Sequence, residues 1–307
     1  MRVPPWAAGI LIVMSERPVV PAPSFAVTGA TGQLGRRVVD GLLRRGIPAG
    51  NVFALVRDLE KAKDLADLGV GIREADYDRP DTLGPALEGI ERLLLVSSPD
   101  SANAVRQHTA VIDAADAADV GFVVYTSVIH ADETELVLAP KHAETEDVLQ
   151  GSGLPFAVAR NGWYTENYTA RLEEFLARGE IVGAAGQGRI SAATRADFAE
   201  AAVSLLTGDI TDQQGYWELG GPAFTLAELA ETITEVTGTT VVYRDLSVEE
   251  LTDHLAGAGM DRATAEFVAS LDGSAARGEL ETDSPALENL LGRAPTPLVD
   301  AVRAARL

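Results

Sequence analysis

Short strand-like runs alternate with helical patterns along the first half of the chain. The runs that predict strands are 25–27, 52–56, 71–75, 93–96, 122–125 and 156–159. Between them, apolar residues recur at helical spacing over 36–43, 59–68, 83–87, 102–118 and 144–150. Regular alternation of this kind predicts a parallel, doubly wound α/β sheet with helices on both faces.

The pattern changes after about residue 160. Helical patterns cover 169–178, 195–206 and 263–271, while 216–219 and 241–243 have the pattern of strands. Thr225 with Glu228, and Ser247 with Glu250, form capping boxes that each begin a helix. We therefore expect residues 161–307 to form mainly a smaller α/β lobe over the carboxyl edge of the sheet, with some chain returning to the first domain.

The first 24 residues precede the first predicted strand. Their apolar stretch, 6–14, is too short to span a bilayer, and three prolines follow it. We interpret residues 1–24 as a disordered tail or a start-site artefact and not as a targeting signal. The doubly wound domain then covers residues 25–160.

Three glycines lie between the first strand and its helix, in a segment (28–35) that we call the glycine turn. Gly29 permits a tight turn, Gly32 lets the backbone approach a pyrophosphate, and Gly35 lets the helix pack closely on the sheet. Phosphates bind well at a helix N-terminus, where N–H groups are free and the dipole favours negative charge. The turn therefore predicts a dinucleotide-binding Rossmann domain. Its candidate cofactor residues are Gly29, Thr31, Gly32, Gln33, Leu34 and Gly35.

The residue type at the end of the second strand indicates whether such a fold binds NAD(H) or NADP(H). NAD-binding folds place Asp or Glu there to hold the ribose 2′-hydroxyl, whereas this chain has Arg57. A guanidinium binds a 2′-phosphate bidentately, and a carboxylate would repel it. Asp58 opposes this assignment, while Lys61 and Lys63 add positive charge. We predict NADP(H), with the alternative that Arg57 is only a solvated strand-end charge.

Ligands of doubly wound sheets bind outside the carboxyl ends of the strands. Several polar segments follow predicted strands and are therefore expected to meet at this edge. They are Asp76-Tyr77, placed where an adenine would lie, Ser97-Ser98, Thr126-Ser127, Lys141-His142 and the segment 161–164. These segments are the first candidates for a cofactor and substrate site.

A proton relay that is usual in short-chain reductases is missing. These enzymes protonate their substrate with a Tyr-x-x-x-Lys pair, and none of the six tyrosines here has a lysine four residues later. Reduction of a ketone produces a strongly basic alkoxide and needs a positioned acid. Reduction of a quinone produces a weakly basic hydroquinone anion, which takes its proton from water. The missing pair therefore favours a quinone-like acceptor, or a protein that binds NADP(H) without chemistry.

The composition of the chain excludes several kinds of binding partner and site. With a net charge of −21, the chain lacks the clustered Lys and Arg that a nucleic-acid surface needs. The absence of cysteine excludes disulfides and thiolate metal sites, and no cluster of His, Asp or Glu has metal-ligand spacing. We expect a cytoplasmic protein that binds no nucleic acid, membrane or metal; a homodimer is left open.

Several longer motifs carry a family resemblance. They are 125–132 (YTSVIHAD), 142–146 (HAETE), 160–168 (RNGWYTENY), 193–198 (ATRADF) and 216–219 (YWEL). Together they resemble the NmrA-like, atypical short-chain dehydrogenase/reductase family, in its NAD(P)H:quinone oxidoreductase type 2 group. The similarity runs from about Phe25 to Leu298. The Arg-Asn-Gly-Trp-Tyr-x-Glu-Asn motif is far more specific than the glycine turn.

The resemblance implies roles for named residues. The glycine turn and Arg57 would bind NADPH, residues after Ser97-Ser98 would line the cofactor, and the segment 161–166 would lie beside the nicotinamide. In that segment the implied cofactor residues are Asn161, Gly162, Trp163, Tyr164 and Glu166. Asn161 would hydrogen-bond the carboxamide or a quinone oxygen. The alternatives are a simple strand-ending turn at Asn161-Gly162 and plain packing between lobes for Trp163 and Tyr164.

His142 is the second candidate for a catalytic residue, after Asn161. It occupies a helix-start position where related reductases carry a lysine, and a histidine there can donate a proton or a hydrogen bond. The alternative is an exposed helix residue next to Lys141. His130 is a weaker candidate, and we expect His108 and His254 to lie on the surface.

Three functions are compatible with these features. The main hypothesis is a flavin-independent, NADPH-dependent oxidoreductase acting on a small quinone-like substrate. The first alternative is a redox sensor that binds NADP(H) without turnover. The second is a pathway-specific carbonyl or enone reductase, which would need an acid such as His142 within reach of its substrate.

Overall fold

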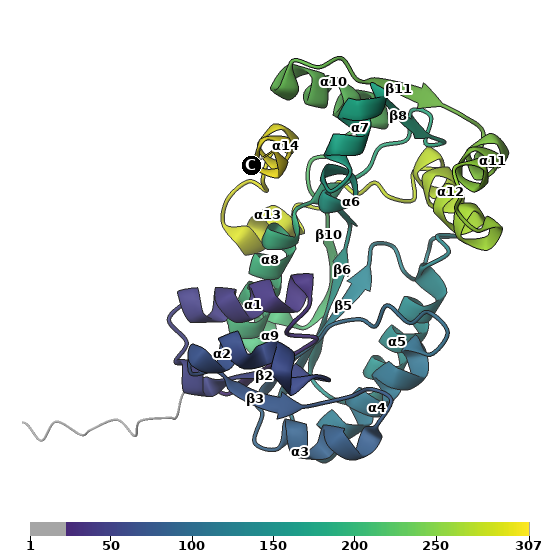
Figure 1. Ribbon diagram of the computed structural model, residues 1–307. Coiled ribbons are helices and arrows are strands. Elements are labelled where there is room, and N and C mark those ends of the chain that lie inside the picture. Colours follow the sequence, from purple (N-terminus) through teal and green to yellow (C-terminus); the bar gives the residue numbers. More distant parts are fainter. Residues whose placement is uncertain (1–22, 307) are drawn as a thin grey trace, which may run out of the picture.

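A seven-stranded parallel sheet forms the centre of the molecule (Figure 1). The computed structural model describes residues 23–306, so the expected tail, 1–24, lies outside the described residues apart from its last two. In spatial order the strands are β10 (Gly215–Leu219), β6 (Phe156–Asn161), β5 (Phe122–Val128), β4 (Arg92–Leu95), β1 (Phe25–Thr28), β2 (Val52–Val56) and β3 (Gly71–Glu74). Every neighbouring pair is parallel, which confirms the doubly wound α/β class.

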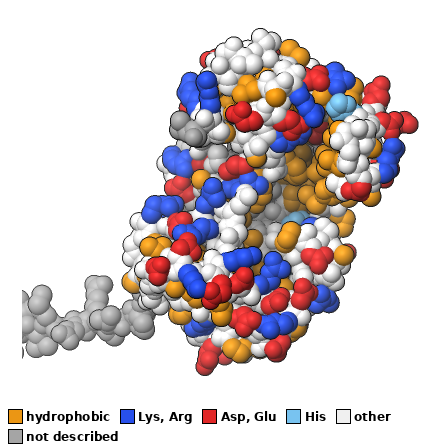
Figure 2. Space-filling view, in the orientation of Figure 1, with side chains coloured by type: hydrophobic (Ala, Val, Ile, Leu, Met, Phe, Trp, Pro, Cys, Tyr) orange, Lys and Arg blue, Asp and Glu red, His pale blue; other side chains and the backbone are white. Residues whose placement is uncertain are grey.

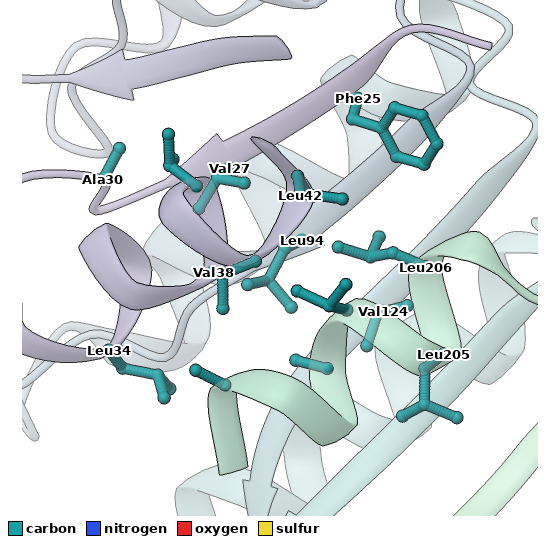
Figure 3. Packing of buried hydrophobic residues seen from close by; sticks show 14 of the residues in the cluster. Phe25, Val27, Ala30, Leu34, Val38, Leu42, Leu94, Val124, Leu205 and Leu206 are labelled. Carbon is teal, nitrogen blue, oxygen red and sulfur yellow. The ribbon is translucent and has the colours of Figure 1, made fainter. Parts of the chain in front are cut away.

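Helices cover both faces of this sheet. On one face α1 (Gln33–Arg44) and α8 (Arg195–Thr207) pack against each other, and on the other lie α3 (Leu83–Leu87), α4 (Ala104–Ala117) and α5 (Ala139–Ser152). Figure 3 shows side chains of α1 and α8 meeting above the buried strands β4 and β5. The helices approach closely because Gly41 faces Val203, where a Cβ would lie 2.8 Å from the valine Cγ2.

The second half of the chain contributes to this sheet. Strand β10 pairs with β6, and Leu219 lies opposite Asn161 in the parallel register. Helix α8, from the same half, buries Phe198, Leu205 and Leu206 against the core of the first domain. The sheet is therefore complete only when chain from beyond residue 160 has joined it.

A smaller α/β layer lies above the sheet in the view of Figure 1. Its strands form two parallel pairs, β8 (Glu180–Gly183) with β11 (Val242–Asp245) and β7 (Trp163–Tyr164) with β9 (Ala192–Ala193). Its helices are α6 (Glu166–Thr169), α7 (Leu172–Arg178), α10 (Leu226–Thr237), α11 (Val248–Gly257), α12 (Arg262–Ala276) and α14 (Leu298–Ala305). Both predicted capping boxes are present, at the starts of α10 and α11.

Shorter elements complete the described chain. They are the 3-10 turns η1 (Ala49–Asn51), η2 (Leu59–Ala62) and η3 (Pro80–Thr82), with helices α2 (Lys63–Asp67), α9 (Ile210–Gln213) and α13 (Ala286–Leu291). Within residues 23–306, no helix has the length and apolar composition needed to cross a bilayer.

A buried carboxylate fixes the C-terminal part of the chain. Asp197, in the first turn of α8, is fully buried. Its oxygens accept hydrogen bonds from the Arg293 guanidinium at 2.9 Å and from the backbone N–H of Thr296 at 3.0 Å. The segment between α13 and α14 is thereby tied to α8, and the buried negative charge has a counterion.

Candidate functional site

The glycine turn has the geometry of an anion-binding loop. Gly29 has a φ of +57°, and its carbonyl accepts a hydrogen bond from the N–H of Gly32 at 2.8 Å. A Cβ at Gly35 would lie 2.4 Å from the Gly29 oxygen, so the third glycine is required by this close approach. Thr31 and Gln33 are exposed at the turn, whereas Leu34 is buried in the core.

The N-terminus of α1 fits a dinucleotide pyrophosphate. The helix begins without a side-chain cap at Gly32, and its first turn holds no acidic residue. Its first N–H groups have no partner within the helix and are directed at the turn, where the dipole favours an anion. The exposed backbone of the glycine turn therefore offers what two phosphates need.

Arg57 is free to bind a phosphate. It follows β2 in an exposed position and makes no hydrogen bond or ion pair with any residue in 23–306. The neighbouring Asp58 caps η2, because one of its oxygens accepts the N–H of Glu60 at 3.0 Å, and its other oxygen lies 3.9 Å from the Lys61 ammonium. The carboxylate that opposed the NADP(H) assignment is thus engaged within its own turn.

Tyr77 joins the carboxyl ends of two central strands. Its phenol lies 2.6 Å from Thr28 Oγ1 and 3.0 Å from the carbonyl oxygen of Val96, and burial raises its pKa. The adjacent Asp76 is half-buried, and its N–H donates to Thr82 Oγ1. The pair lies at the predicted edge, with the tyrosine hydroxyl held by the protein itself.

The paired serines are positioned through their backbone. The N–H of Ser97 donates to Thr126 Oγ1 at 2.9 Å, and the N–H of Ser98 donates to His108 Nε2 at 2.8 Å. These bonds connect the loop after β4 to β5 and to α4. The predicted segments Ser97-Ser98 and Thr126-Ser127 therefore do meet at one place.

The expected surface position of His108 is wrong. The side chain is fully buried between α4 and α5, where Nδ1 lies 2.9 Å from Thr145 Oγ1 and burial lowers its pKa to about 4. Because Nε2 accepts the Ser98 N–H, the single proton of the neutral ring is on Nδ1 and is donated to Thr145. The expected surface position of His254 is not met fully either, because its side chain is half-buried and its Nε2 is closed off from solvent.

His142 is not an exposed helix residue. It lies in the first turn of α5, is buried, and has Nδ1 2.9 Å from the phenol oxygen of Tyr125. Burial and the nearby Lys141 ammonium lower its pKa to about 3. The ring is therefore neutral at pH 7, so it acts there through hydrogen bonds and not as a charged acid.

Asn161 has an unpaired oxygen at the edge of the sheet. It ends β6, between Val128 of β5 and Leu219 of β10, and its side chain is buried. Among the described residues, its Oδ1 is one of the few buried side-chain oxygens without a hydrogen-bond partner. Such an atom costs stability unless a ligand or water pairs with it, so Asn161 fits a group that binds from the cleft.

The residues after Asn161 make mainly internal contacts. A Cβ at Gly162 would lie 2.4 Å from the carbonyl oxygen of Ser191, so glycine is needed for this close crossing of two segments. Trp163 is half-buried and packs against the apolar cluster of the upper layer.

Tyr164 and Glu166 both contact the start of α8. The Tyr164 ring lies edge-on to Phe198 at 5.5 Å, with the Arg195 guanidinium 4.5 Å from its centroid. The Glu166 carboxylate accepts the N–H of Arg195 at 3.0 Å. These contacts agree with the packing alternative for this part of the loop.

Sequence reasoning missed a buried charge cluster below the loop. The guanidinium of Arg160 is buried and pairs with Glu146 at 2.5 Å, Asp132 at 2.8 Å and Glu218 at 3.0 Å. These carboxylates raise its pKa. The sequence did contain a signal for this cluster. Arg160 directly follows the apolar run 156–159, and a charge next to a buried strand needs partners.

His130, the weaker candidate, is engaged in contacts within the protein. It has a φ of +53°, and its Nε2 lies 2.9 Å from the carbonyl oxygen of Glu281. Within residues 23–306, no group of His, Asp and Glu side chains is arranged to hold a metal ion.

A hollow separates the two layers of the molecule. Figure 2 shows it in the middle of the view, with hydrophobic side chains gathered on its wall. The carboxyl ends of the central strands, and with them the segments described above, lie on the side of the sheet that faces the upper layer (Figure 1).

Strand order, glycine turn and carboxyl-edge site together define a Rossmann-type dinucleotide-binding protein. A family model described as NAD(P)H-binding matches residues 29–209. The chain belongs to this NAD(P)H-binding, NmrA-like family.

Two similar proteins and one solved structure match nearly the whole chain. Quinone oxidoreductase 2 of Escherichia coli is 42% identical over 278 residues, which are 91% of this chain and 97% of that protein. An NmrA-like family domain-containing oxidoreductase of Aspergillus flavus is 32% identical over 91% of this chain and 94% of its own. The crystal structure of an Escherichia coli NADPH-dependent quinone oxidoreductase complexed with NADPH has a TM-score of 0.88 at 41% identity, covering 92% of this chain and 100% of that one.

Proposed function

We propose that this protein is an NADPH-dependent oxidoreductase that reduces a quinone-like acceptor without flavin. The observation that carries the proposal is the state of the polar groups at the site: Asn161 offers an unpaired oxygen, while Tyr125 and His142 are buried and uncharged at pH 7. These groups orient and hydrogen-bond, which suffices for a quinone. The full-length likeness to a quinone oxidoreductase supports the same choice.

Each part of the site has one task in this proposal. The glycine turn binds the pyrophosphate, and Arg57 binds the 2′-phosphate. Asn161 orients the nicotinamide carboxamide or a quinone oxygen. NADPH, when bound, supplies two electrons and one hydrogen to the acceptor. The second hydrogen of the hydroquinone comes from solvent.

The two alternatives are less well supported. A carbonyl or enone reductase needs an acid, and His142 is neutral with a pKa of about 3. A redox sensor would bind NADP(H) without turnover, and a measurement of NADPH oxidation distinguishes it from an enzyme. The net charge of −21 supports the exclusion of nucleic acid as a partner.

The proposed activity is tested by incubating the protein with NADPH and either benzoquinone or a naphthoquinone while the absorbance of NADPH is followed. We expect oxidation well above the uncatalysed rate with at least one quinone. A rate equal to the uncatalysed one, together with clearly different affinities for NADPH and NADP⁺, would support the sensor instead.

The role of Asn161 gives a sharper test. Asn161→Ala should lower kcat/KM for the quinone by roughly tenfold or more, because a lost positioning hydrogen bond costs about 1–3 kcal/mol. The matched control is Asn289→Ala, which removes the amide of an exposed residue in α13. Equal activity of the two variants would remove Asn161 from the site.

A further inference from the structure

Tyr125 and His142 form a buried pair beneath the start of α5. The tyrosine lies in β5 with its side chain fully buried, and its phenol oxygen is 2.9 Å from His142 Nδ1. The ring centroids are 6.0 Å apart. The proposed function does not say what the Tyr125 phenol hydrogen-bonds to, although a buried phenol needs a partner.

The hydrogen bond has a definite direction. Thr145 lies nearby, but its hydroxyl donates to the carbonyl oxygen of Lys141 at 2.7 Å and accepts the proton of His108. The Tyr125 phenol has two polar partners among the described residues, which are His142 Nδ1 at 2.9 Å and the Thr145 side chain. Because the Thr145 hydroxyl already donates to Lys141 and accepts from His108, Nδ1 of His142 is the unoccupied acceptor for the buried phenol O–H, so the phenol donates and Nδ1 accepts.

The direction fixes the tautomer of His142. A neutral imidazole carries one proton, and with Nδ1 as acceptor that proton is on Nε2. Nε2 makes no hydrogen bond to any residue in 23–306, and it is not among the buried atoms that lack a partner, so it is open to solvent. Because α5 follows a parallel strand, its first turn lies at the carboxyl edge, where ligands bind.

We propose that Tyr125 is a positioning residue for the quinone reduction: it holds His142 as the Nε2–H tautomer, so that Nε2–H donates a hydrogen bond to a substrate oxygen as negative charge develops there. This inference rests on the proposed function and deepens it. A fixed, neutral donor stabilises a developing oxyanion without transferring a proton. Burial raises the pKa of Tyr125 and lowers that of His142, so both groups keep these roles across the physiological range.

Nitrogen-15 NMR of the wild-type protein tests the tautomer directly. The His142 signals are assigned by their absence from the His142→Gln variant. We expect Nε2 protonated and Nδ1 unprotonated from pH 5 to 8. A proton on Nδ1, or a doubly protonated ring at pH 6, would overturn the inference.

A double-mutant cycle tests the coupling in catalysis. Tyr125→Phe should lower kcat for the quinone by about fivefold in the wild-type background and by less than about twofold in a His142→Leu background. The affinity for NADPH should stay within about twofold in both backgrounds, because neither side chain is placed at the phosphates. Equal losses in the two backgrounds would show that the phenol acts only through stability.

Two further comparisons separate the possible failures. Tyr216→Phe, at an exposed tyrosine of the edge strand β10, is the matched control and should leave kcat unchanged. If none of the quinones tested supports NADPH oxidation by the wild-type protein, the proposed function fails. The NMR result still decides the tautomer of His142 in that case. If turnover is present and the cycle is additive, only the positioning role fails.

Discussion

The glycine turn and the cluster around His142 lie at the same edge of the sheet but are built in different ways. The turn consists of backbone atoms from eight consecutive residues, and its shape depends on side-chain atoms that are absent. The α5 cluster (His108, Tyr125, His142 and Thr145) consists of side chains from three elements. A local chain segment can specify the first, whereas only the completed fold brings the second together.

The largest effect is expected at Gly35, where the dependence of the glycine turn on an absent side chain can be tested. A Cβ at this position would lie 2.4 Å from a backbone oxygen that cannot move aside alone, so Gly35→Ala must distort the turn. We expect NADPH affinity to fall by about 100-fold or more, which is about 2.7 kcal/mol, measured by calorimetric titration.

Gly84 offers the matched control for that variant. It also lies in a helix, and a Cβ there meets nothing within 4 Å. Gly84→Ala should therefore keep wild-type affinity. If Gly35→Ala bound NADPH within threefold of this control, the turn would not depend on missing atoms.

The α5 cluster predicts a dependence of stability on pH. The pKa of His108 is about 4 in the folded protein and about 6.5 in the unfolded chain, because burial disfavours the charged ring. The unfolded chain then binds more protons between these values. The stability due to neutral His108 is complete above pH 6.5 and is lost as the pH falls through this window.

Urea unfolding at pH 7 and pH 5 measures this effect. His108→Gln should reduce the loss of stability between the two pH values by about 2 kcal/mol relative to wild type. His130→Gln, at a half-exposed histidine, is the control. An identical loss in wild type and His108→Gln would mean that the buried ring does not govern the acid response.

The smallest expected effect belongs to an exposed side chain beside the turn. Arg57→Asp should weaken NADPH binding by more than about tenfold, or over about 1.4 kcal/mol, and spare NADH, since one charge-assisted contact is replaced by repulsion. Arg303→Asp, an exposed arginine in α14, controls for the change in charge. Equal losses for both cofactors would make Arg57 structural.

Much of the fold and the geometry of the glycine turn follow from the sequence, because strand, turn and helix are adjacent there. The α5 cluster could be predicted from the sequence only in part. His108 lies four residues before Ile112 and seven before Ala115, on the buried stripe of α4, so helical spacing did carry a signal for its burial. The partner of Tyr125 could not be inferred, because the distance between β5 and α5 is set by packing and not by sequence spacing.

Strand β10 and helix α8 come late in the sequence, and this order affects how the protein folds during its synthesis. A ribosome releases residues 25–160 first, yet β6 then lacks its outer neighbour and the apolar face of α1 lacks α8. Until about residue 219 has emerged, the nascent chain exposes an open strand edge and a hydrophobic helix face, the two features that favour aggregation and chaperone binding. The first half of the described chain thus depends for its completion on the half that follows it.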